Sequence, residues 1–137
     1  MAPDDSLKTR LRDVGLRATR ARLAVLGHLQ GQDGPRSHAE VVTALASDGW
    51  DRATLYRNLN DLAAAGLVRR MDVDHVWRFE LSSRADASGH SHGHFVCTDC
   101  GDVQCLPTLD IRGSTESIPV LQRHHELQIR GVCDGCV

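Results

Sequence analysis

The sequence of 137 residues is poor in aromatic side chains, which make up only 4 % of it, and it contains no long apolar run. A membrane-spanning helix needs about 20 consecutive apolar residues, so no span is expected. The acidic start, Met1 to Asp5, lacks the apolar segment of a secretory signal. We therefore expect a cytoplasmic protein with no membrane partner. Thiols stay reduced in that compartment, so the five cysteines indicate metal ligation rather than disulfides.

The remaining composition is that of a folded protein, with 41 % hydrophobic and 25 % charged residues. The net charge of −2 conceals a difference between two parts of the chain. Residues 1–70 carry 11 Lys and Arg against 8 Asp and Glu, whereas residues 71–137 carry 5 against 10. All five cysteines and six of the eight histidines lie in the second part. The first part therefore suits a polyanion and the second suits cations.

Hydrophobic spacing and turn residues predict four helices followed by two strands in the first part of the chain. The four helices are expected over Ser6–Asp13, from a Thr19 cap to Gly31, from a Ser37–Glu40 capping box to about Ser47, and from Asp51 or Arg52 to Gly66. The strands are expected over Leu67–Met71 and Val76–Leu81, with Trp77, Phe79 and Leu81 on one face. This order describes a winged helix-turn-helix.

The fourth helix would bury its leucines and present a polar side. That side carries Thr54, Tyr56, Arg57, Asn58 and Asp61. Arginine and asparagine are the residue types that most often read base edges in the major groove. A solvated face on an ordinary small helical domain explains the same pattern, and the pattern by itself leaves both interpretations open.

The polar stretch from Ser82 to Ser91 has no periodicity and is read as a linker. The chain would then consist of a winged-helix domain over 1–81, a hinge or linker over 82–91 and a second domain over 92–137. Short strands are expected in the second domain at His94–Cys97, Asp102–Leu106 and Leu127–Val132, with a short or irregular helix in 113–124. The fold class is α+β, with a small C-terminal α/β domain.

Two C-x-x-C pairs, Cys97/Cys100 and Cys133/Cys136, supply four thiolates for one tetrahedral zinc ion. A redox C-x-x-C would need a thioredoxin-like βαβ context, which is absent, and two disulfides disagree with a reducing compartment. Few large apolar residues lie between the pairs, so structural zinc would supply much of the second domain's folding energy.

Three segments together resemble the ferric uptake regulator (Fur) family of bacterial metal-sensing repressors, over nearly the whole chain. They are Gly15–Arg22 (GLRATRAR), Ala53–Leu59 (ATLYRNL) and His92–Gly101 (HGHFVCTDCG). The resemblance implies a homodimer that binds palindromic operator DNA when a regulatory divalent ion is bound, and a four-cysteine structural zinc. It implies that Tyr56 and Arg57 read DNA. The matched motifs add Arg17, Thr19, Arg20, Thr54 and Asn58 to the expected DNA-binding residues.

The resemblance also implies a regulatory metal site, whose ligands map to Glu80, His92, His94 and Cys105. Iron- and manganese-sensing relatives have a carboxylate where this chain has Cys105, and the family's loop histidine falls near Pro35. A thiolate and a lower ligand count favour tetrahedral zinc over a larger N/O shell. Cys105 could instead be a small buried hydrophobe. Weaker candidates for metal ligands are His38, His90 and His125.

These observations predict a zinc-responsive repressor of metal-uptake genes with no small-molecule substrate. An iron-, manganese- or peroxide-responsive repressor of the same family is the alternative. A zinc enzyme is disfavoured because neither H-E-x-x-H nor H-x-E followed by P-C-x-x-C is present. A zinc-ribbon interaction module without a DNA role is the remaining alternative, and the ATLYR segment argues against it.

Overall fold

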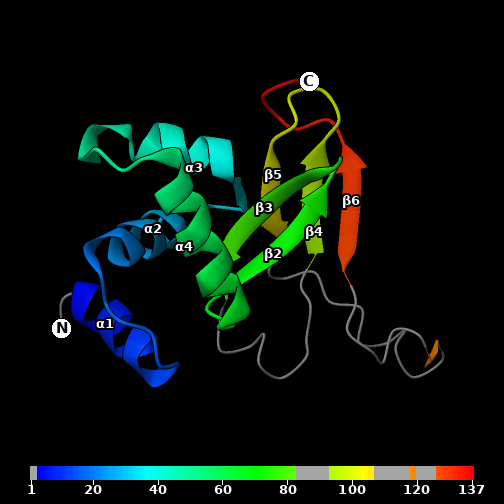
Figure 1. Ribbon diagram of the computed structural model, residues 1–137. Helices are drawn as coiled ribbons and strands as arrows, with labels where there is room; N and C mark the ends of the chain where they lie inside the picture. Colours follow the sequence, from blue (N-terminus) through cyan, green and yellow to red (C-terminus); the bar gives the residue numbers. More distant parts are fainter. Residues whose placement is uncertain (1–2, 83–92, 107–117, 120–125) are drawn as a thin grey trace. The chain divides into compact units, whose positions relative to one another are not determined.

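A computed structural model describes residues 3–82, 93–106, 118–119 and 126–137 (Figure 1). The chain divides into two compact units, Met1–Ser82 and Ser83–Val137. Among the described residues, no helix is both long enough and apolar enough to cross a membrane.

The first unit contains the four expected α-helices: α1 (Pro3–Asp13), α2 (Arg20–Gln30), α3 (His38–Ala44) and α4 (Arg52–Ala64). Thr19, Ser37 and Asp51 cap α2, α3 and α4, because each side chain accepts a hydrogen bond from a backbone N–H of the first turn. Helix α1 begins three residues before the predicted start.

The third helix is shorter than predicted. Its α-helical part ends at Ala44, and a 3₁₀ turn, η1 (Ala46–Asp48), covers the rest of the predicted range. Gly49 then adopts φ 79°, a left-handed conformation that ends helices and that glycine takes without steric cost.

A three-stranded sheet in the order β1-β3-β2 completes the first unit, formed by β1 (Arg36–Ser37), β2 (Val68–Val73) and β3 (Val76–Leu81). The β2–β3 hairpin has a two-residue turn, Asp74–His75, in which both residues have positive φ (53° and 68°). This is the conformation favoured by the right-handed twist of hairpins, and the Asp72 carboxylate accepts a bond from the His75 N–H at 2.9 Å. The predicted strands, ending at Met71 and starting at Val76, left Asp72–His75 as a four-residue turn; that prediction was wrong, and β1 was not predicted.

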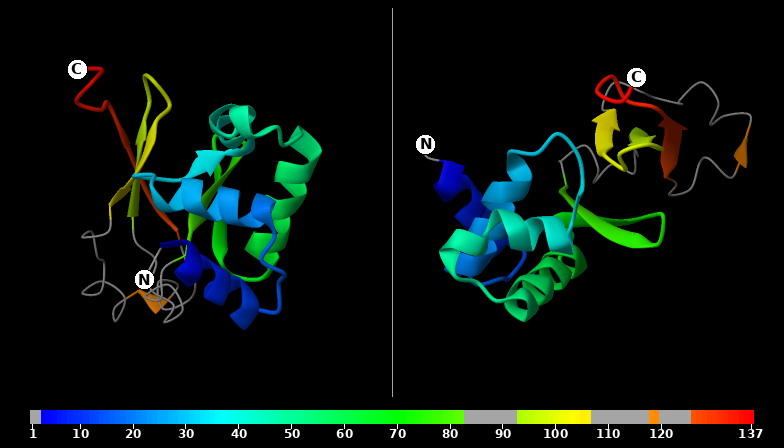
Figure 2. Two further views of the ribbon diagram at one scale, coloured as in Figure 1. Left: turned by 90° about the vertical axis from the view of Figure 1, so that its left-hand side faces the viewer. Right: turned by 90° about the horizontal axis from the view of Figure 1, so that it is seen from above.

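The leucine stripe of α4 forms the centre of one hydrophobic core, to which α1, α2, α3 and the hairpin contribute. Leu55, Leu59 and Leu62 are fully buried there. Phe79 is 1 % exposed and packs in the same core, but Trp77 on the same strand face is 47 % exposed. The two differ because the hairpin tip extends beyond the helices (Figure 2).

The described part of the second unit is a sheet in the order β5-β4-β6, formed by β4 (Gly93–Cys97), β5 (Val103–Leu106) and β6 (Leu127–Gly131). Strand β4 pairs antiparallel with β5 and parallel with β6. All three strands were predicted to within two residues. The predicted irregular helix in 113–124 lies almost entirely outside the described residues. The architecture is α+β, with a winged helix-turn-helix in the first unit.

Candidate functional site

The two C-x-x-C pairs come together at one end of the second sheet. Because β4 and β6 are parallel, with Cys97 opposite Gly131, the turns that follow both strands lie at the same end. One ligand atom from each of Cys97, Cys100, Cys133 and Cys136 lies within 4.8 Å of the others. Gly101, at φ 78°, allows the first turn to reverse the chain tightly. The cluster can hold one metal ion, and its four sulfur donors suit a tetrahedral ion.

The thiols differ in acidity. The backbone N–H groups of Cys100 and Cys133 both donate to Cys97 Sγ at 3.4 Å, and these bonds lower the pKa of Cys97 to about 6. Hydrogen bonds with the thiols of Cys133 and Cys100 raise the pKa of Cys136 to about 12. Four sulfurs this close therefore cannot all ionise at neutral pH on their own. A bound cation would supply the missing charge, which is the chemistry expected of a metal centre.

A second pair of predicted ligands lies on the same sheet. His94 on β4 is directly opposite Cys105 on β5, so the two side chains share one face of the sheet. Cys105 is half-buried. The third predicted ligand, Glu80, belongs to the first unit and stands opposite Arg69 in the β2–β3 register. His90, His92 and His125 lie outside the described residues.

The predicted DNA-binding side of α4 faces solvent. Tyr56 is 46 % exposed and Arg57 is exposed, while Thr54 and Asn58 are half-buried. Hydrogen bonds from the Thr54 side chain and backbone N–H lower the pKa of the Asp51 carboxyl, which keeps this cap ionised.

Two other predicted DNA-binding residues, Arg17 and Arg20, are exposed at the start of α2. Thr19 between them is half-buried, and its hydroxyl accepts the Arg22 N–H at 3.3 Å. That bond gives Thr19 a capping role in this structure.

His38 is held by contacts within the first unit. Its Nε2 is 2.9 Å from the Arg52 carbonyl oxygen, and its ring meets the Tyr56 ring edge to face with centroids 5.2 Å apart. These contacts tie the start of α3 to the first turns of α4. They favour a structural role for His38 over metal ligation.

Arg22 connects α2 to α4. Its guanidinium donates to the Arg17 carbonyl at 2.9 Å and pairs with the Asp61 carboxylate at 3.4 Å. Asp61 was predicted only as part of the polar side of α4, and here it fixes that helix against its neighbour.

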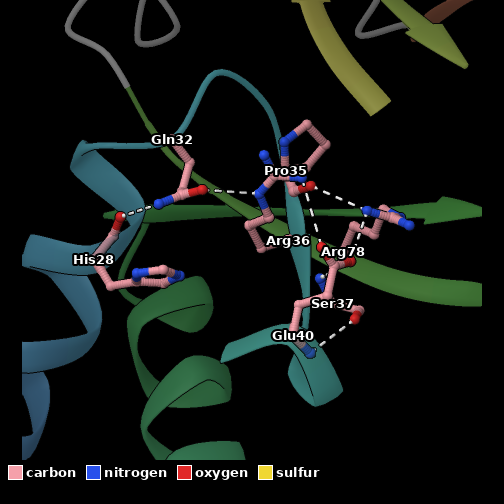
Figure 3. A network of polar contacts seen from close by, with 7 residues as sticks. All are labelled: His28, Gln32, Pro35, Arg36, Ser37, Glu40 and Arg78. Atoms are coloured by element: carbon pink, nitrogen blue, oxygen red, sulfur yellow. Dashed lines mark hydrogen bonds and ion pairs between the residues drawn. The ribbon is translucent and has the colours of Figure 1, made fainter. Parts of the chain in front are cut away.

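Glu40 is the centre of a polar network that the sequence did not reveal (Figure 3). Its carboxylate accepts from Arg78 at 2.9 Å, from the Ser37 N–H at 3.3 Å and from Arg36 at 3.5 Å. Arg78 also donates to the Pro35 carbonyl at 3.2 Å. The capping box at Ser37 was the only part with a sequence signal, because Arg78 joins through the pairing of β3 with β1, opposite Ser37 and 41 residues away.

A winged helix with an exposed polar recognition helix, in one chain with a four-cysteine cluster, defines a metal-responsive DNA-binding regulator. The chain belongs to the ferric uptake regulator family, whose sequence model matches residues 13–130. Members of this family are transcription regulators rather than enzymes.

Named relatives carry different specificities. The peroxide-responsive repressor PerR of Staphylococcus saprophyticus is 31 % identical over 97 % of this chain and 90 % of its own length. The crystal structure of the Vibrio cholerae ferric uptake regulator is 32 % identical, with a TM-score of 0.73, over 92 % of this chain and 98 % of that one. A zinc uptake regulator in complex with zinc and DNA, 23 % identical over 99 % of this chain and 96 % of that one, shares the fold with a TM-score of 0.67.

Proposed function

We propose that this chain is a metal-dependent transcriptional repressor that binds palindromic operator DNA as a homodimer and responds to zinc. Residues 1–81 bind DNA, residues 92–137 bind metal and dimerise, and residues 82–91 connect them. The observation that carries the zinc assignment is the strand register that puts Cys105 opposite His94.

The DNA-binding role is supported by the polar side of α4. Tyr56 and Arg57 are accessible to base edges, since both are exposed while the leucines behind them are fully buried. Arg17, Arg20, Thr54 and Asn58 complete the proposed interface. A side chain that hydrogen-bonds a base edge contributes about 1–3 kcal/mol of discrimination, and Arg57→Ala should lose that amount. Arg130→Ala, an exposed arginine of the second unit, is the control.

The four-cysteine cluster is proposed as a structural zinc site. Cys133→Ser should lose about one tightly held zinc ion per chain and leave the second unit unfolded or unable to dimerise, because zinc binding and folding are coupled in such sites. Zinc content by mass spectrometry and sedimentation measure the two effects. If Cys133→Ser kept its zinc and stayed dimeric, the four-cysteine cluster would not be a structural zinc site.

The regulatory site is proposed to consist of Glu80, His92, His94 and Cys105. A thiolate beside an imidazole is a soft, borderline ligand pair that suits zinc better than ferrous or manganous ions. Four ligands also match the tetrahedral geometry of zinc. Ligands drawn from both units would favour one angle between them. In a dimer that angle sets the distance between two recognition helices, which must match the spacing of the half-sites.

Cobalt substitution tests the zinc assignment. The loaded protein should show intense tetrahedral d–d bands and a sulfur charge-transfer band beyond those of the four-cysteine site. Cys105→Ser should remove the additional band and weaken metal-activated operator binding, while Cys136→Ser should affect the structural site instead. An octahedral spectrum, or a Cys105→Ser protein with an unchanged metal response, would contradict zinc sensing.

Peroxide-responsive repression is a second candidate, favoured by the 31 % identity to the Staphylococcus saprophyticus repressor. It requires that protein loaded with ferrous iron lose operator binding after brief exposure to hydrogen peroxide. The zinc-responsive assignment expects the iron-loaded protein to bind DNA weakly from the start.

A further inference from the structure

A groove of about 590 Å³ runs between the second half of α4 and strand β2 of the wing. Its lining consists of Tyr56, Asn60, Ala63, Ala64 and Arg70. All five belong to the first unit, and none of the motifs in the sequence includes Asn60, Ala64 or Arg70. The groove therefore begins at Tyr56, one of the proposed base-reading residues, and continues past it to residues that no motif includes.

Arg70 is directed to this groove by the strand register. It stands opposite Phe79, on the sheet face that packs against the helices. Phe79, on the central strand β3, is covered by the core, whereas Arg70, on the edge strand β2, is exposed. Its guanidinium carbon is 4.3 Å from the centroid of the Trp77 ring, which is the geometry of a cation–π pair. Trp77 thereby holds the arginine head beside the groove.

The lining combines hydrogen-bond donors with small alanine side chains, a composition that suits an anion. The phenol of Tyr56, the amide of Asn60 and the guanidinium of Arg70 are hydrogen-bond donors, and the part of the chain that the structure describes adds no carboxylate to the lining. The small side chains of Ala63 and Ala64 leave room for a bulky anion to approach the helix closely. The nearest acidic residue along β2, Asp72, has its carboxylate on the His75 N–H in the hairpin turn.

A recognition helix in the major groove has a phosphodiester strand on each side of it. Because only three residues separate the end of α4 from the start of β2, the hairpin stays beside α4 and would lie next to one of these phosphodiester strands. We propose that the groove between α4 and β2 receives this strand of the operator, with Arg70 as a phosphate ligand and Trp77 as the residue that positions it. This inference rests on the proposed DNA-binding function and adds a backbone contact that is independent of base sequence.

Salt dependence provides the direct test, because each phosphate contact contributes about 0.9 to the slope of log affinity against log salt. Between 50 and 200 mM salt, the ratio of wild-type to Arg70→Gln affinity should therefore fall about 3.5-fold for each contact removed. Arg69→Gln is the matched control, since it removes the same charge from the next position of β2 on the opposite sheet face. The affinities of both variants for operator DNA and for unrelated DNA are measured at saturating metal.

A second pair of variants tests the groove without changing Arg70. Ala64 is exposed in the lining, so Ala64→Glu should weaken and Ala64→Lys should strengthen binding to both DNAs, relative to Ala64→Gln. The same charges at Gln30, exposed at the end of α2 and outside the groove, should have much smaller effects.

Fluorescence of Trp77 reports occupancy independently of affinity. Trp50→Phe leaves Trp77 as the only tryptophan, and it breaks no protein hydrogen bond because Trp50 Nε1 has no partner among the described residues. Bound DNA should protect Trp77 from acrylamide quenching. Equal salt slopes for Arg70→Gln and Arg69→Gln, or unchanged quenching with DNA bound, would overturn the inference. If wild-type protein with metal bound no DNA at all, the proposed function would fail instead.

Discussion

Glu40 offers the sharpest test of how the first unit holds its recognition helix. The carboxylate closes the capping box of α3 and accepts from two arginines, Arg78 on β3 and Arg36 on β1. Glu40→Ala removes all of these contacts. The Ser37 hydroxyl still accepts the backbone N–H of residue 40, so the capping box loses only the bond from the Ser37 N–H, worth about 0.5–1.5 kcal/mol. The Glu40 side chain is 40 % exposed, so each ion pair contributes at most about 1 kcal/mol after screening by solvent.

The expected loss in free energy of unfolding is therefore about 2 kcal/mol. In a unit of this size each kcal/mol lowers the midpoint by about 4–8 °C, so a shift of about 8–16 °C is expected. Circular dichroism at 222 nm on the full chain with metal follows this transition, because the four α-helices described here all belong to the first unit.

Glu40→Gln separates the two contributions. Its amide oxygen can still accept the Ser37 N–H, so the capping box is largely kept while both ion pairs are lost. This variant should lose about 1 kcal/mol or less. If Glu40→Ala melted within 2 °C of the wild type (about 0.5 kcal/mol or less), the network would be a surface feature without a role in stability.

Three further variants test other parts of the fold. Burial, followed by the nearby Arg36 charge, lowers the pKa of His28, so the folded state favours the neutral ring. The free energy of unfolding should therefore fall as the pH drops below about 6.5, where the ring is protonated in the unfolded chain. Urea titrations at a series of pH values should show a smaller fall for His28→Gln. Leu59→Ala should cost about 2–5 kcal/mol by leaving a cavity in the fully buried stripe of α4, which a melt at 222 nm would detect. Gly131→Ala would bring a methyl group within 3.2 Å of the Phe95 ring and should destabilise the metal-bound second unit. Adding Phe95→Leu to the same chain should relieve that loss. If the free-energy changes of the two substitutions simply added, there would be no clash between the methyl group and the ring.

The parts of the fold predicted correctly are those with local causes. Thr19 and Ser37 cap their helices through bonds that span three residues, so their signal is contained in a short segment. The fourth helix was predicted to open at Asp51 or Arg52, and Asp51 is its cap. The stripe of leucines in α4 has the period of one helix face and is buried as expected. The short spacing within each C-x-x-C likewise indicated that its two thiols lie close together, whereas the two pairs meet through the parallel pairing of β4 and β6.

The parts that were missed depend on partners distant in sequence. The two residues of β1 become a strand only because β3 lies beside them, with Arg36 opposite Phe79. Asp74–His75 lacks the glycine that usually marks a two-residue hairpin turn, so the longer turn was the natural expectation. Alternation placed Trp77 and Phe79 on one face correctly, but alternation does not show where the helices that cover that face end.

The length of the hairpin turn determines where the arginines of β2 and β3 lie. In a β-strand a shift of one residue moves every side chain to the opposite face, so turn length determines what each arginine can reach. With the two-residue turn, Arg70 stands opposite Phe79 beside α4, and Arg78 stands opposite Met71, where it reaches Glu40. A turn of another length would separate both arginines from these partners. The wing thus supports the start of α3 and presents a cation beside α4 through the same register, so under the proposed phosphate contact its geometry matters for DNA binding as well as for folding.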